Sequence, residues 1–178
     1  MTLTRLLDAA LLGAQPEEII FTSGGTESCN LAIKGMFWAR HNADARRVRI
    51  LASSIEHHAV LDPVQWLGDS KQAEVEWIPV DAVGRIDLDA LKASIQRDPD
   101  SVALISVMWA NNEIGTIEPI EEVVQLAHQF GIPVHTDAVQ AIANIAATYS
   151  TIGDVFNVGS TGEVTIKQLA DQVLAITG

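Results

Sequence analysis

Basic residues and cysteines are scarce in this chain. Eleven lysines and arginines stand against 23 aspartates and glutamates, which gives a formal net charge of −12 over 178 residues. This imbalance argues against nucleic acid or an anionic membrane surface as a partner, because both are bound through clusters of positive charge. The single cysteine, Cys29, excludes an internal disulfide and favours a reducing compartment.

Long apolar runs and a signal segment are missing as well. No stretch approaches the roughly 20 apolar residues that a membrane-spanning helix needs, and no basic-then-apolar segment opens the chain. We therefore expect a cytoplasmic protein without a membrane partner. Apolar residues still make up 48% of the sequence, so the chain can bury a sizeable core.

Short apolar runs alternate with segments of helical periodicity along the chain. Strands are expected at 19–23, 48–53, 75–79 and 102–108, and in a run that ends at Asp137. Helices are expected at about 2–13, 28–40 and 88–96, and from Pro119 to near Gly131. This alternation is typical of an α/β fold, with a mostly parallel sheet and helices on both faces.

Polar side chains follow the ends of these strands, where open α/β sheets place their chemistry. Asp137 ends one strand, and Gln140 follows three residues later. A carboxylate here would stay ionised beside a cationic ring nitrogen, which is what the protonated pyridine of pyridoxal phosphate (PLP) offers. The alternative is that Asp137 caps the next helix, a common role for Asp after a strand.

Two further strand ends have the composition of ligand sites. Gly24-Gly25-Thr26 precedes a helix, so its backbone N–H groups and the Thr26 hydroxyl could hold a phosphate, or simply form an ordinary helix cap. His57 and His58 are adjacent, and adjacent side chains diverge, so no metal site is expected. One imidazole could instead lie flat on a cofactor ring, unless it is a solvated or core histidine.

Taken together and in this order, these strand ends resemble the cysteine desulfurase family of PLP enzymes, in the class V aminotransferase group. The matching stretches are 21–28, 56–61, 111–117 and 135–140. The resemblance covers about residues 1–146 and implies a truncated large domain of a PLP-dependent transferase. In the family, the reaction moves sulfur from L-cysteine to an enzyme cysteine and releases alanine, in the service of sulfur metabolism and iron–sulfur cluster assembly.

The resemblance also implies a role for each matching residue. The backbone of Gly25 and the hydroxyl of Thr26 would hold the phosphate, and His57 would stack on the ring and assist proton transfer. Asp137 would pair with the pyridinium nitrogen.

The amides of Asn112 and Gln140 would reach the phenolic oxygen of the ring. Cys29 stands where the family usually has Asn, so it is expected to pack as a small apolar group rather than accept sulfur.

The chain departs from the family after the strand that ends at Asp137. The family continues with a Ser-x-His-Lys segment whose lysine forms the Schiff base, and no such segment follows here. Lys167 lies in a stretch typical of an amphipathic helix and is expected to be a solvated surface lysine. Residues 147–178 are interpreted as an unrelated tail with one strand and one helix.

This tail resembles the C-terminal part of nucleotide-sugar epimerases, although the chain has neither a Gly-x-Gly-x-x-Gly loop nor a Tyr-x-x-x-Lys pair. The sequence therefore predicts a truncated cysteine desulfurase-like protein that binds PLP weakly and non-covalently and is inactive alone. L-cysteine is the substrate that the resemblance implies, and a homodimer or larger assembly is expected. The alternatives are a non-catalytic PLP-binding or assembly module, or an epimerase-like nucleotide-sugar binder.

Overall fold

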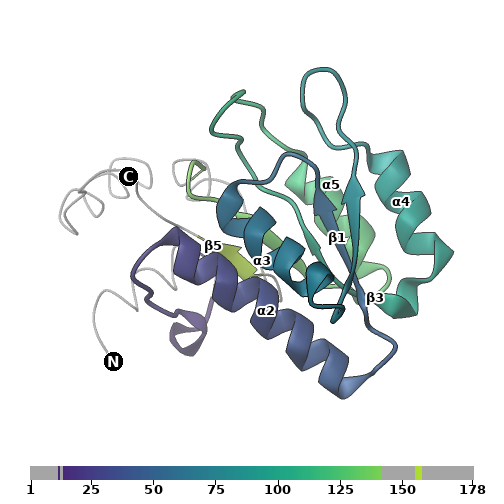
Figure 1. Ribbon diagram of the computed structural model, residues 1–178. Helices are drawn as coiled ribbons and strands as arrows, with labels where there is room; N and C mark the ends of the chain where they lie inside the picture. The colour runs from purple at the N-terminus through teal and green to yellow at the C-terminus, as the bar shows by residue number, and fades with distance from the viewer. Residues whose placement is uncertain (1–11, 13, 142–154, 158–178) are drawn as a thin grey trace.

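The computed structural model of the chain describes residues 12, 14–141 and 155–157, and Figure 1 shows their arrangement. Five strands form one sheet in the order β2-β1-β3-β4-β5, and each pairs in parallel with its neighbours. The strands are β1 (Arg49–Ser53), β2 (Glu74–Ile78), β3 (Val102–Ser106), β4 (Val134–Asp137) and β5 (Val155–Asn157). The expected parallel sheet is confirmed.

Helices cover both faces of this sheet, as the sequence predicted. On one face α2 (Gly25–Ala43) and α3 (His58–Asp69) bury apolar side chains against β1 and β3. On the other face α4 (Leu88–Arg97) and α5 (Ile120–His128) pack in a second apolar cluster. Two short 3-10 helices, η1 (Pro16–Glu18) and η2 (Pro99–Ser101), complete the described elements.

The central strands are buried over their whole length, and the outer strand is not. Every residue of β1 and β3 is buried, which is typical of parallel strands covered on both faces. In β2 only Ile78 is buried, and Trp77 remains 36% exposed. The buried centre of the sheet is therefore formed by β1 and β3, and the candidate site lies at the carboxyl ends of these strands.

The expected strand at 19–23 is wrong. Ile19 follows directly on η1, and Ile20 and Phe21 are 66% and 54% exposed. Within the described residues this segment pairs with no strand. An apolar run indicates a preference for burial, but a strand forms only where a neighbouring strand supplies hydrogen-bond partners.

Helix α3 was not predicted, because Pro63 and the polar neighbours of His57 disguise its periodicity. Its buried residues are Ala59, Val60, Pro63, Val64 and Leu67, which is the spacing of one helical face. Pro63 lies in the second turn, where the missing N–H removes one hydrogen bond without stopping the helix. Helix α2 begins at Gly25, three residues before the expected start at 28.

Several expectations concern residues outside the described part. The expected helix at about 2–13 lies outside it except for residue 12, and so do the helix of the tail and Lys167. The tail does contribute β5, which extends the sheet beside β4. The division into 1–146 and an unrelated tail at 147–178 stays a prediction. None of the described helices is both long enough and apolar enough to cross a bilayer.

Candidate cofactor site

The candidate site lies at the carboxyl edge of the sheet. Because the strands are parallel, β1, β3 and β4 all end at this edge, and the first turns of α2 and α3 begin there. The residues delivered to it come from four segments that are far apart in sequence. Topology alone therefore gathers most of the polar groups that the sequence singled out.

Asp137 is the last residue of β4, and it is only 5% exposed. Its Oδ1 accepts a hydrogen bond from the backbone N–H of Val139 at 3.0 Å, which is the local turn that Asp often makes. Burial raises the pKa of Asp137, and the Val139 N–H, the nearby charge of His57 and the thiol of Cys29 only partly oppose this. A buried carboxyl group in this position is best stabilised by a further cation.

Cys29 connects helix α2 to Asp137. The side chain is fully buried, as expected for a small apolar group, and its Sγ donates to Asp137 Oδ2 at 3.9 Å. The sequence did not predict this contact, because residues 108 positions apart meet only through the fold. Thr26 lies one turn before Cys29 on the same side of α2, so it lies toward the same edge.

The start of α2 leaves room beside its backbone. A side chain added at Gly24 would have no other atom of the described chain within 4 Å. The Glu27 carboxylate turns back to accept hydrogen bonds from Ser23 N and Ser23 Oγ, both at 2.6 Å. The hydroxyl of Thr26 has no partner among the described residues. This open turn at a helix N-terminus has the shape that an anion requires.

His57 and His58 turn their Nδ1 atoms to different partners, although their rings lie edge to face with 6.4 Å between the ring centroids. His57 caps α3, and its Nδ1 accepts from the Ala59 N–H at 3.1 Å, which leaves the exposed ring free to present Nε2. His58 turns away toward Asp62, with 3.3 Å between Nδ1 and Oδ1. Among the described residues, no group of three or more His, Cys, Asp or Glu could hold a metal ion.

Asn112 and Gln140 lie at the rim of this edge. Both are exposed, and neither side chain has a hydrogen-bond partner among the described residues. The buried neighbour Asn111 shapes the loop: its Nδ2 donates to Ile55 O at 2.9 Å, and its Oδ1 accepts from the N–H groups of Glu113 and Ile114. At this edge Asp137 is buried, whereas Thr26, His57 and the two amides are exposed to solvent.

Two buried titratable residues at this end of the sheet, Glu56 and His135, were given no role from the sequence. Glu56 is 4% exposed, and burial raises the pKa of its carboxyl group to about 8. His135 is fully buried on β4 with its Nδ1 2.9 Å from Ser106 Oγ, and burial lowers its pKa to about 4. An acidic residue three positions after a buried apolar strand is the signal that could have indicated a role for Glu56.

The lysines of the described part lie elsewhere. Lys34 is placed over the ring of Trp66, with Nζ 4.5 Å from the ring centre. Lys71 follows the C-terminal end of α3, and Lys92 is exposed on α4. Within the described ranges, no lysine stands beside Asp137.

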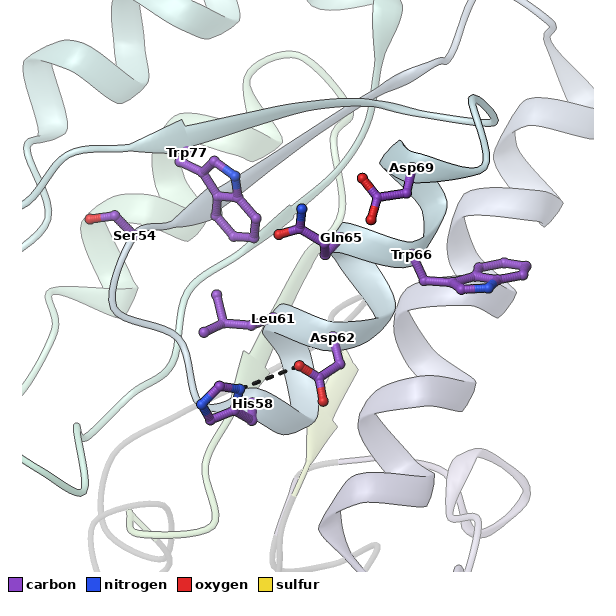
Figure 2. A pocket seen from close by; sticks show the side chains of 8 residues that line it. All are labelled: Ser54, His58, Leu61, Asp62, Gln65, Trp66, Asp69 and Trp77. Carbon is purple, nitrogen blue, oxygen red and sulfur yellow. Dashed lines mark hydrogen bonds and ion pairs between the residues drawn. The ribbon is translucent and has the colours of Figure 1, made fainter.

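A separate hollow of about 550 Å³ opens between α3 and β2, and Figure 2 shows its lining. Exposed side chains surround it, among them His58, Asp62, Trp66 and Trp77. The candidate site lies at the carboxyl ends of the strands. This hollow is a different place, on the solvent side of α3.

Comparison with known proteins identifies relatives over most of the chain. The chain is 50% identical over 149 residues to an IscS-like cysteine desulfurase of Mycobacterium tuberculosis, which covers 84% of this chain and 38% of the relative. It is 49% identical over 145 residues to the cysteine desulfurase IscS of Methanosarcina thermophila, covering 82% and 34% of the two chains. The chain thus spans little more than a third of the length of these relatives.

Solved structures show the same similarity. A NifS-like protein superposes with a TM-score of 0.70 at 38% identity, covering 79% of this chain and 37% of the other. The protein SspA, solved in complex with cysteine, superposes with a TM-score of 0.69 at 38% identity and covers 78% and 38%.

The family profile of the class-V aminotransferases matches residues 1–161 and so extends into the tail. The expected resemblance of the tail to nucleotide-sugar epimerases finds no support in these comparisons. Over about four-fifths of its length the chain is homologous to cysteine desulfurases. The chain belongs to the aminotransferase class-V family.

Proposed function

We propose that this chain binds pyridoxal phosphate at the carboxyl edge of its sheet. Members of its family use this cofactor. The observation that carries the proposal is Asp137, a carboxyl group that is 5% exposed and whose pKa is raised by burial. A protonated pyridine nitrogen is the cation that would stabilise this carboxylate, because an opposite charge at hydrogen-bonding distance favours the ionised form.

The other residues at the edge suit the remaining parts of the cofactor. The open turn at Gly24, the N–H groups at Gly25 and Thr26 and the Thr26 hydroxyl would hold the phosphate. The exposed ring of His57 would stack on the cofactor and hold a proton at Nε2, because Nδ1 already accepts from Ala59.

The rim amides of Asn112 and Gln140 would donate to the phenolic oxygen, since neither has another partner among the described residues. When bound, the cofactor withdraws electrons from the bond to be broken in an amino acid substrate. The protein's part is to orient it and to keep Asp137 ionised.

The substrate that this proposal implies is L-cysteine, with sulfur transfer and release of alanine as the overall reaction. The cysteine desulfurase relatives and the cysteine complex of SspA support this choice. No described lysine lies at the edge, and no Ser-x-His-Lys segment follows β4 in the sequence. We therefore infer that this chain, as it stands, holds the cofactor without a covalent bond and does not turn over cysteine, as a non-catalytic binding module would.

Titration of the purified chain with pyridoxal phosphate, followed by equilibrium dialysis, tests the proposal. Replacement of Asp137→Asn should weaken binding about tenfold or more, because one lost charge-assisted pairing is worth roughly 1.5–3 kcal/mol. Asp62→Asn removes the same charge from the exposed hollow and should leave the affinity unchanged. Equal affinities for the two variants would show that Asp137 does not pair with the ring.

Borohydride reduction and peptide mass mapping test the non-covalent mode. We expect no lysine to carry a stoichiometric adduct, and Lys167→Ala to change nothing. A full adduct at Lys167 that its replacement abolishes, together with alanine release from L-cysteine, would make the chain an enzyme in its own right.

A further inference from the structure

Glu56 is a buried carboxyl group at the carboxyl edge, and the proposed chemistry gives it no role. It follows β1 by three residues and is 4% exposed. Its Oε1 accepts a hydrogen bond from the backbone N–H of Met108 at 2.6 Å. Its Oε2 is buried and has no hydrogen-bond partner in the described part of the chain. A carboxylate would be unfavourable here, because each buried oxygen of the charged form needs donors.

The Glu56–Met108 bond is one half of a two-point connection between two loops. The other half is the bond from Asn111 Nδ2 to the carbonyl of Ile55, at 2.9 Å. One loop joins β1 to α3 and leads directly into His57, and the other follows β3 and leads into Asn112. The side chain of one residue from each loop therefore binds the backbone of the other.

The charges around Glu56 are negative. Asp137 at the end of β4 and Glu118 before α5 both raise the pKa of Glu56, in addition to the larger effect of burial, and only the Met108 N–H opposes them. Glu118 is itself 3% exposed, and its Oε2 accepts from the Ile86 N–H at 2.8 Å. No lysine or arginine contributes to the pKa of Glu56. A proton on Oε2 removes the buried charge and with it the repulsion from Asp137.

We propose that Glu56 is a positioning residue that acts as a neutral carboxylic acid, and that it joins the loop carrying His57 to the loop carrying Asn112. Because Glu56 is neutral, Asp137 is the one charged carboxylate beside the place of the cofactor ring. The single positive charge of the ring nitrogen is then enough to balance it. The part that concerns the cofactor rests on the proposed function. The connection between the loops does not.

Two substitutions separate the bond from the charge. Glu56→Gln has the shape and hydrogen-bonding pattern of the protonated acid, so it should keep the bond to Met108 and cannot ionise. Glu56→Ala removes the acceptor and leaves the Met108 N–H buried without a partner. Glu74→Gln serves as the matched control, because it makes the same chemical change at an exposed residue of β2.

Nuclear magnetic resonance of the chain without cofactor gives the first measurement. In the unmodified protein the Glu56 carboxyl carbon, the Met108 amide and the His57 ring signals should shift together as the pH passes about 8. In Glu56→Gln the Met108 amide and the His57 ring should show no step near pH 8, because the residue at position 56 can no longer lose a proton. Replacement of His57→Gln identifies the His57 signals among the five histidines. The Glu74→Gln variant should repeat the unmodified protein.

Cofactor affinity gives the second measurement. At pH 7 Glu56→Gln should bind pyridoxal phosphate within twofold of the unmodified protein, and Glu56→Ala about tenfold more weakly. If Glu56→Ala does not fold, the Gln variant still carries the test.

The outcomes separate the two proposals. The role of Glu56 would be overturned if its carboxyl carbon titrates near the ordinary pKa of a glutamate. It would also be overturned if the Met108 and His57 signals do not shift together with that carbon, even when the cofactor binds. Failure of every variant to bind the cofactor, with the shared shifts intact, would overturn the proposed function and leave the connection between the loops standing.

Discussion

His57 and His58 are neighbours in sequence, yet the carboxyl groups near His57 are buried and those near His58 are exposed to solvent. His57 lies at the carboxyl edge, where Glu56 and Asp137 are almost fully buried and burial raises the pKa of each. His58 lines the hollow of Figure 2 and pairs with Asp62, and the two side chains are 81% and 76% exposed. Water and salt screen such a pair, so it contributes little.

The difference shows that binding of a proton has a large energetic effect at the carboxyl edge and a small one in the hollow. The pKa of a buried carboxyl group changes strongly when one cation is added or one hydrogen bond is lost. The pKa of an exposed carboxyl group changes little under the same alteration. The four predictions below test this contrast, in order of decreasing effect on the free energy of unfolding.

Removal of a buried acceptor should have the largest effect. At pH 6, Glu56→Ala should lower the free energy of unfolding by about 1–3 kcal/mol, the cost of leaving a buried N–H without a partner. Asp62→Ala in the hollow should change it by less than about 0.5 kcal/mol, as for most surface substitutions. Urea denaturation followed by circular dichroism measures both. Equal losses would remove the contrast between the two regions.

The pH dependence of stability should carry the signature of the buried groups. Glu56 has an ordinary pKa of 4.5 and a folded pKa of about 8, so the folded state binds the extra proton and stability falls between these pH values. His135 is lowered from 6.5 to about 4, so its contribution is lost as the pH falls from 6.5 to 4.

The two slopes oppose one another below pH 6.5, so stability should decline on the alkaline side of that pH by at most about 1.4 kcal/mol per unit. Thermal unfolding at pH 5, 6, 7 and 8 checks this. Glu56→Gln should flatten the alkaline decline, and a variant that declines as steeply as the unmodified protein would contradict the assignment to Glu56.

Cys29→Ser should have a smaller effect. The thiol packs in the apolar cluster beneath α2 and makes a long contact of 3.9 Å with Asp137, so a hydroxyl should cost about 1 kcal/mol or less. Cofactor affinity should not change within error, and mass spectrometry should find no persulfide at Cys29 after incubation with L-cysteine and cofactor. Either a lost affinity or a persulfide would make Cys29 part of the chemistry.

Replacement of exposed apolar side chains should change the stability least and the association most. Ile20 and Phe21 are 66% and 54% exposed, and apolar surface of this kind favours contact with other chains. We expect the unmodified chain to form dimers or larger assemblies at micromolar concentration, and the double variant Ile20→Ser with Phe21→Ser to sediment as a smaller species. A monomeric unmodified chain would show that these side chains do not drive assembly.

The sequence predicted the architecture well because alternation and burial are local signals. The runs at 48–53, 75–79 and 102–108 all became parallel strands, and Asp87 caps α4 through the Ala90 N–H where a helix was expected. The strand at 19–23 failed because pairing is a property of neighbours, which a single run of residues does not contain.

The sequence indicated residues that the fold places at one edge of the sheet, but it did not indicate the electrostatics of that edge. Motifs indicated Thr26, His57 and Asp137, which the fold brings to one edge, and they also indicated the exposed Asn112 and Gln140. They included Glu56 without giving it a role, and they did not indicate its bond to Met108 or the Cys29–Asp137 contact. Those depend on side chains from segments 52 and 108 positions apart, and nothing in the local pattern encodes such a meeting.

The parallel order of the sheet has a consequence for how the chain folds. Strand β1 pairs with β2 through the short α3 connection, whereas its pairing with β3 spans roughly twice as much chain. Loop closure favours the nearer partner, so the β1–α3–β2 unit should form first and β3 should insert afterwards. The contact of Glu56 with Met108 then belongs to a late step of folding. In pulsed hydrogen exchange during refolding, the Met108 amide should gain protection after the amides of β1 have done so.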